Sequence, residues 1–141
     1  MNSLLVIAML VSGVYVVAST NNFVIENQPT QKIIKVDGAN NTRSIKAMEG
    51  DIIVIEGVNN KINVVGDFSE LKVEGANNVV RAEGVKKIYV EGTNNVFNLA
   101  KVDVVNIEGA GNKVNYKSTT SKTGIPIGKT EGVNNVITKV K

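Results

Sequence analysis

Six acidic residues, each followed directly by glycine, are the groups in this sequence whose types and spacing could do chemistry. They are Asp37, Glu56, Glu74, Glu91, Glu108 and Glu131. Apolar and polar residues alternate before each glycine, so the acids are expected on the outward face of short strands. If equivalent strands lie side by side, the carboxylates form one acidic column. Directly opposed like charges in such a column are destabilising by about 0.2–1 kcal/mol per pair.

Two arrangements could offset this repulsion. Lys35, Lys72 and Lys129 each stand two residues before one of the acids and could form surface ion pairs with them. Alternatively, a divalent cation could bridge successive carboxylates, because calcium binds about six to eight oxygen ligands. Each repeat offers only one acid, and the calcium-binding pattern Gly-Gly-x-Gly-x-Asp does not occur in the sequence. The sequence therefore favours ion pairs and predicts neither a metal site nor a cofactor.

The composition excludes several classes of chemistry. The 141 residues include no His, Cys or Trp, so zinc sites made of Cys and His, thiol nucleophiles, disulfides and imidazole bases are excluded. A net charge of +3 with only three Phe and three Tyr does not predict nucleic-acid binding. Solvated carboxylates offer neither the burial nor the cleft that shifts a catalytic pKa. We therefore predict that the protein is not an enzyme and has no catalytic residues and no small-molecule substrate.

Each acid opens a short repeat with the order acid, Gly, small residue, Asn, Asn. The full copies span residues 56–60, 74–78, 91–95 and 131–135, and looser copies span 37–41 and 108–112. The glycines stand at positions 38, 57, 75, 92, 109 and 132, with steps of 19, 18, 17, 17 and 23. A repeat period near 17 or 18 residues is typical of stacked coils.

Two short strands fit within each repeat, one before the glycine and one after the Asn pair. Ile55, Val73, Val90 and Ile107 stand two residues before their glycines and are expected to form one inward-facing file. We predict an all-β, single-domain parallel β-solenoid (β-helix) of about six 17–18-residue coils over residues 32–141. Equivalent strands would lie about 4.7–4.9 Å apart and bury a continuous core that no single coil could bury alone.

The Asn pairs have a structural and a functional interpretation. Asn tolerates the left-handed backbone conformation and hydrogen-bonds its own turn, which would place the pairs at coil corners. Stacked copies such as Asn59, Asn77 and Asn94 could also form amide ladders. A polar binding stripe is the functional alternative. The structural interpretation is favoured, because turn chemistry already accounts for both residues.

The step of 23 residues before Gly132 indicates an insertion in the last repeat. Residues 117–126 read as a surface loop at a coil corner. Insertions of this kind map to one face of a repeat protein, which is often the binding face. The loop is the predicted irregular contact surface.

Residues 1–20 form a separate hydrophobic segment, expected to be helical. Residues 4–18 are almost wholly apolar, and no charged side chain precedes Glu26. The segment fits a retained membrane anchor, although it is short against the roughly 17–25 residues of a spanning helix. It also fits a cleaved signal peptide, with Val16-Val17-Ala18 before the cleavage point, although a basic n-region is missing. Residues 21–31, which contain Pro29, read as a connector.

The repeated Val-x-Gly-x-Asn-Asn-x-Val, as at residues 73–80, resembles a group of short-repeat β-solenoid proteins of uncharacterised function from bacterial cell envelopes. The resemblance covers roughly residues 32–141, going by the repeat spacing. It implies an envelope or secreted protein, and it carries over no functional residue.

The expected function is that of a non-enzymatic structural or interaction protein. In this interpretation residues 1–20 hold a rigid solenoid rod at a membrane, where it contacts other protein subunits. A minor structural protein of a membrane-containing virus particle would match this arrangement. The alternative is a secreted or cell-envelope solenoid that loses its signal peptide and binds cations or glycans along its outer face.

Overall fold

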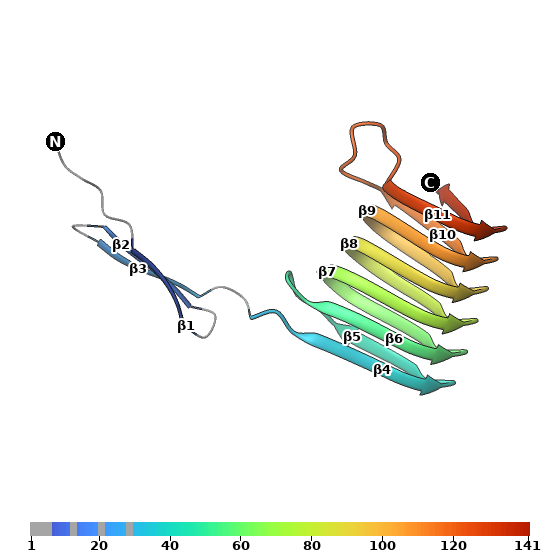
Figure 1. Ribbon diagram of the computed structural model, residues 1–141, viewed down its shortest axis with the longest axis horizontal. Coiled ribbons are helices and arrows are strands. Elements are labelled where there is room, and N and C mark those ends of the chain that lie inside the picture. Colours follow the sequence, from blue (N-terminus) through green and yellow to red (C-terminus); the bar gives the residue numbers. More distant parts are fainter. Residues whose placement is uncertain (1–6, 12–13, 20–21, 28–29) are drawn as a thin grey trace. The chain divides into compact units, whose positions relative to one another are not determined.

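A computed structural model describes the backbone of residues 7–11, 14–19 and 22–27, and both backbone and side chains of residues 30–141. The chain divides into two compact units, residues 1–31 and 32–141 (Figure 1). Each unit is described by itself.

The first unit contains a three-stranded antiparallel sheet in the order β1-β2-β3. Its strands are β1 (Ile7–Val11), β2 (Val14–Ser19) and β3 (Asn22–Asn27). The helix predicted for residues 1–20 is therefore replaced by strands wherever that segment is described, and residues 1–6, 12–13 and 20 lie outside the described residues. Among the described residues no helix is long and apolar enough to cross a membrane. β3 occupies much of the stretch 21–31 that the sequence assigned to a connector.

The composition of β1 and β2 gives the physical reason for this difference. β2 contains three Val and a Tyr, and β1 contains one Ile and one Val; such β-branched and aromatic side chains favour extended backbone. Hydropathy alone did not distinguish an apolar helix from two apolar strands of this length.

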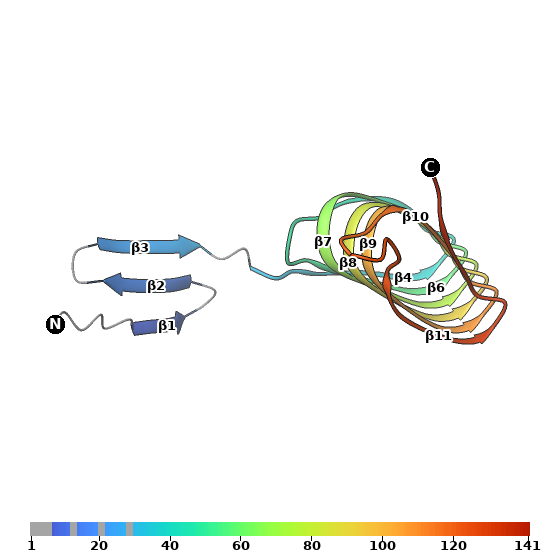
Figure 2. The same cartoon turned by 90° about the horizontal axis from the view of Figure 1, so that it is seen from above.

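The second unit is a parallel β-solenoid, which confirms the predicted all-β architecture of residues 32–141. Viewed end-on, its strands follow one flattened coil and stack behind one another (Figure 2). The strands are β4 (Ile33–Ala39), β5 (Thr42–Lys46), β6 (Ile52–Val58), β7 (Lys61–Ala76), β8 (Val79–Thr93), β9 (Val96–Ala110), β10 (Lys113–Ser118), β11 (Ile127–Val133) and β12 (Val136–Lys139). β7, β8 and β9 each begin after one Asn pair, bend around the side of the coil away from the Asn corners, and end just after the next repeat glycine. Each therefore belongs to two successive repeats.

The register of the stack follows the sequence repeat. The repeat glycines pair directly across neighbouring strands, from Gly38 with Gly57 through to Gly109 with Gly132. Six copies of the strand before the glycine are thus stacked, and five steps separate the first from the last. The solenoid makes about five turns. The prediction of about six coils was too high, because it counted repeat copies rather than the steps between them.

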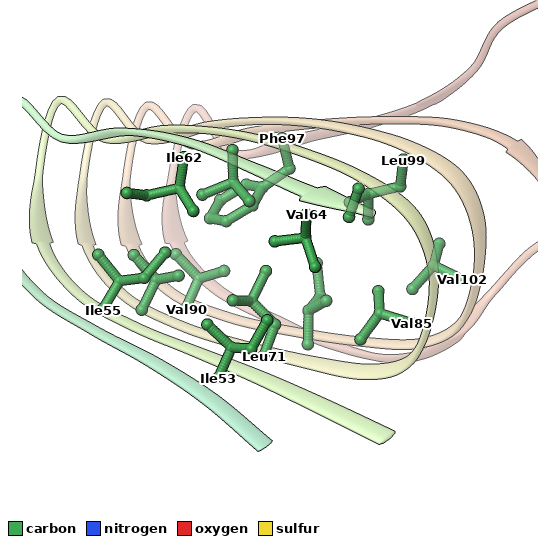
Figure 3. Close-up of a cluster of buried hydrophobic side chains, with 14 of the residues drawn as sticks. Ile53, Ile55, Ile62, Val64, Leu71, Val85, Val90, Phe97, Leu99 and Val102 are labelled. Atoms are coloured by element: carbon green, nitrogen blue, oxygen red, sulfur yellow. The ribbon is translucent and has the colours of Figure 1, made fainter. Parts of the chain in front are cut away.

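The core is a set of straight files of apolar side chains. Ile55, Val73, Val90 and Ile107 form the predicted file and are only 0%, 1%, 2% and 3% exposed. Figure 3 shows Ile55 and Val90 on one wall of the coil, facing Ile62 and Phe97 on the other. Full burial of such side chains contributes about 1.5–3 kcal/mol each. Because each coil covers its neighbours, the files extend through the middle coils without interruption.

Candidate functional site

The first Asn of each pair shapes the corner of its coil. Asn40, Asn59, Asn77, Asn94 and Asn134 all have left-handed backbone, with φ between 55° and 58°. In the looser repeat at 108–112, Gly111 takes this place with φ of 67°. These values confirm the interpretation of the first Asn as a turn residue.

The second Asn of each pair forms a ladder inside the corner. Asn78 is fully buried, and its Nδ2 donates to Gly57 O of the preceding coil (2.9 Å) and to Asn95 Oδ1 of the next (3.0 Å). Its Oδ1 accepts the backbone amide of Asn60 at 3.0 Å. Asn95 and Asn112 are buried and bond both neighbouring coils in the same way. Asn60 is also buried, and its Nδ2 donates to Gly38 O of the preceding coil. The predicted amide ladder is therefore present. Its side chains are buried inside the coil corners, so they do not form a polar binding stripe on the surface.

The six acids form one outward column in exact parallel register, as the spacing predicted. Lys35 Nζ lies 3.4 Å from Asp37 Oδ1 and 2.9 Å from Glu56 Oε2, and Lys129 pairs with Glu131. The hydrogen bond to Glu56 raises the pKa of Lys35, and the one to Glu131 raises the pKa of Lys129. Two of the three predicted lysines thus neutralise part of the column.

Lys72 differs from that prediction. Its Nζ pairs with Glu70 Oε1 at 3.2 Å, two residues earlier in the strand, rather than with Glu74. Glu74, Glu91 and Glu108 make no ion pair within residues 30–141, which the structure describes in full. In that same stretch no three carboxylates are grouped closely enough to hold a metal ion. The middle of the column is an exposed, uncompensated row of negative charge.

A second polar column lies on the opposite outer face, and sequence reasoning assigned it no role. It runs along the third position of the strand after each Asn pair, where the alternation already placed polar residues. Its members are Ser44, Asn63, Arg81, Asn98, Asn115 and Thr138. Asn115 Nδ2 donates to Asn98 Oδ1 at 3.0 Å. A shallow open groove follows this column, with Val65, Ala100 and Val140 on one side.

The inserted loop, predicted at 117–126, spans residues 119–126 because β10 extends to Ser118, and Asp103 ties it to the solenoid. The backbone amide of Thr120 donates to Asp103 Oδ1 at 2.7 Å, and the Thr119 hydroxyl donates to the same oxygen at 3.4 Å. Burial raises the pKa of Asp103, but the hydrogen bonds from Thr120 and Thr119 and the charge of Lys101 together outweigh it, so the pKa lies below its ordinary value of 3.8. Tyr116 fixes the other side of the loop through a bond from its hydroxyl to Gly124 O (3.2 Å).

Asp51 is a buried carboxylate that the sequence did not single out. It is 3% exposed and accepts the backbone amides of Met48 (3.0 Å) and Lys32 (3.3 Å). Both of its oxygens are therefore engaged in holding the first coil closed. No buried side-chain nitrogen or oxygen within residues 30–141 lacks a hydrogen-bond partner.

Comparison with known proteins assigns no activity. A family model described as a protein of unknown function (DUF3060) matches residues 55–103. This stretch covers the central coils, so that part of the chain is similar to an uncharacterised family. No curated protein and no solved structure matches the chain.

Proposed function

We propose that residues 32–141 act as a rigid, non-enzymatic structural or interaction element within a larger assembly. The proposal is supported by the buried polar side chains, which form hydrogen bonds within the solenoid. Four buried Asn side chains link successive coils, and the buried Asp51 closes the first coil. Polar groups committed in this way stiffen a scaffold, since each would be costly to leave unpaired. The outer faces are then free to contact neighbouring proteins.

Sedimentation of the native chain from its source tests this proposal. The chain should travel with a larger assembly, and chemical cross-links should join its outward lysines, such as Lys72 and Lys113, to other proteins. A chain that sediments alone under mild extraction, without cross-links, would contradict the proposal. A turnover activity abolished by substituting Glu91 while the fold is kept would contradict its non-enzymatic part.

Attachment to a membrane through residues 1–20, in a virus particle or a cell envelope, remains a prediction. Intact mass and fractionation of the native protein decide between anchor and signal peptide. Met1 retained in a membrane or particle fraction supports the anchor. A mature chain that begins near Ser19 in the soluble fraction supports secretion instead.

The second outer face favours a second candidate function, the binding of glycans by a secreted or envelope protein. Amide and guanidinium groups of Asn63, Arg81 and Asn98 repeat along the shallow groove, and such groups suit sugar hydroxyls. Replacing Asn98 by Ala should weaken binding to a glycan array, whereas replacing Asn106 on the opposite outer face should not. Equal binding by both variants would exclude the groove.

A further inference from the structure

The two ends of the solenoid carry open strand edges. The first end is β4 with β5, and the last end is β11 with β12. Large apolar side chains are exposed at both, including Ile33 (66%) at the first end and Ile127 (68%) at the last. Unpaired edges of this kind are templates for further pairing.

Every interior corner uses the same four hydrogen bonds to join one coil to the next. Two donors point forward along the chain and two point back. Between the second and third coils the bonds are Asn59 N to Ala76 O (3.0 Å), Asn60 N to Asn78 Oδ1 (3.0 Å), Asn78 Nδ2 to Gly57 O (2.9 Å) and Val79 N to Asn60 O (2.8 Å). The pattern is directional, so the two ends of the stack present different groups.

At each end corner one neighbouring coil is missing, and the Asn side chain there forms a hydrogen bond within its own corner. Asn41 Nδ2 donates to Asp37 O within its own corner (3.0 Å), and Asn135 Nδ2 donates to Glu131 O (3.0 Å). At Asn78, Asn95 and Asn112, Nδ2 instead bonds both the coil before and the coil after. Within residues 30–141, Asn41 Oδ1 accepts no hydrogen bond and the backbone N–H of Asn135 donates none. The first end thus offers an acceptor where the last end offers its donor.

We propose that a second copy of this chain docks head to tail, with its first end on the last end of the copy before it. Gly132 would lie opposite Gly38 of the next copy, which continues the glycine register. The four corner bonds would then form again across the junction. They are Asn134 N to Ala39 O, Asn135 N to Asn41 Oδ1, Asn41 Nδ2 to Gly132 O and Thr42 N to Asn135 O, where residues 39, 41 and 42 belong to the next copy.

The side chains at the two ends fit this register. Ile127 lies opposite Ile33 of the next copy, so two largely exposed apolar side chains cover each other. Lys129 comes within reach of Asp37 of the next copy, as Lys35 reaches Glu56 one coil along. Because the two contacting ends are different surfaces, the contact does not close on itself and generates an open filament.

Charge sets the conditions for docking. β4 and β5 carry Lys35, Arg43 and Lys46 against Asp37, and β11 and β12 carry Lys129 and Lys139 against Glu131. Both ends are therefore net positive and repel each other at low ionic strength. Salt screens this repulsion, since the Debye length falls from about 8 Å at 0.15 M to about 3 Å at 1 M. Association should therefore be weak in dilute buffer and strengthen with salt.

The mass of the full chain, measured by sedimentation velocity against protein concentration in low and high salt, tests the proposal. The mean mass should rise with both variables and pass beyond a dimer. Ile33→Lys and Ile127→Lys each add a cation to the junction, and each should reduce association at least tenfold. Val58→Lys is the matched control, because Val58 is exposed (40%) in the second coil, outside both end strands, and the variant should associate like the parent.

Mixing the two end variants gives the sharpest result. Ile33→Lys keeps an intact last end and Ile127→Lys keeps an intact first end, so the mixture should form dimers and stop there. A parent chain that stays monomeric at every concentration and salt would overturn the proposal. So would a parent that saturates as a dimer, or end variants that associate as well as Val58→Lys.

Discussion

At the scale of single residues, the two Asn of a pair have opposite roles although they are adjacent. Asn77 bends the backbone at a φ of 56° and is exposed, whereas Asn78 is buried and bonds both neighbouring coils. Left-handed backbone is tolerated by Asn at low cost. Burial of an amide is tolerated only when its hydrogen bonds are made.

Asn78→Ala should lower the free energy of unfolding by about 2–4 kcal/mol, because the substitution leaves buried backbone groups unpaired at about 1–3 kcal/mol each. The groups affected are the Asn60 amide and the Gly57 carbonyl. Urea denaturation measures the change. Asn63→Ala, at an exposed Asn of the outer face, should stay within about 0.5 kcal/mol of the parent; equal losses in the two variants would refute the ladder's role.

Gly75→Ala should lower the stability of the fold more than Gly50→Ala does, although both glycines have positive φ. A Cβ at Gly75 would overlap the carbonyl oxygen of Gly57, so the coils would have to separate. Gly50 also has positive φ (96°), but its Cβ would meet open space. Gly50→Ala should cost about 1–2 kcal/mol from backbone strain alone, and Gly75→Ala should cost more by about 1–3 kcal/mol of overpacking. Thermal melting of both variants provides the comparison.

At the scale of elements, the inserted loop shows how a surface segment is held by a few polar contacts. Residues 119–126 connect β10 to β11 and interrupt the repeat, and their backbone is tied down at Asp103 and at Tyr116. The rest of each coil is held by strand pairing and buried files. The order of the loop therefore depends in part on the single charge of Asp103.

The contact between Asp103 and the loop should weaken in acid. Because the pKa of Asp103 in the folded protein lies below its ordinary 3.8, the carboxylate contributes stability that is complete above that value. The contribution is lost as the pH falls through the lower, folded-state pKa. Hydrogen exchange at the Thr120 amide should therefore lose protection below about pH 4.

Asp103→Asn keeps an acceptor oxygen and removes the titration. Protection of the Thr120 amide in this variant should be weaker at neutral pH and should show no specific step in acid. An identical acid step in parent and variant would place the titrating group elsewhere.

At the scale of the whole solenoid, stability is expected to build up coil by coil. Residues 76–92 form one complete repeat, and deleting them would join Gly75 to Thr93 with the glycine register intact. The shortened chain should fold cooperatively with a lower free energy of unfolding and a lower denaturant m-value, since both follow the number of stacked units and the buried surface.

A half-repeat deletion is the control for this experiment. Removing residues 76–83 alone would delete one corner, with Asn77 and Asn78, and the strand that follows it, so the coil could not close and cooperative unfolding should be abolished. If this chain folded as well as the one that lacks a full repeat, the stacking model of the energetics would be wrong.

The repeat sequence alone was sufficient for the architecture of residues 32–141. The recurring glycines, the left-handed first Asn and the period-two strands specify a corner, its spacing and its inward files. These features are local and repeated, so each copy reinforces the same register. That is why the buried file of Ile55, Val73, Val90 and Ile107 and the acidic column could both be predicted.

Tertiary structure decided the features that depend on what lies one coil away. Only the stack shows that Asn78 and its equivalents are internal, and that Lys72 prefers Glu70 to Glu74. The partners of Asp51 and Asp103 likewise depend on the stack. Each carboxylate accepts a backbone amide about one coil away along the chain, that of Lys32 for Asp51 and that of Thr120 for Asp103. For β1 and β2, hydropathy is the same for a helix and for strands, and only backbone pairing between the two segments distinguishes them. Spacing along a chain sets which residues recur together, but the partner of each side chain depends on geometry between coils.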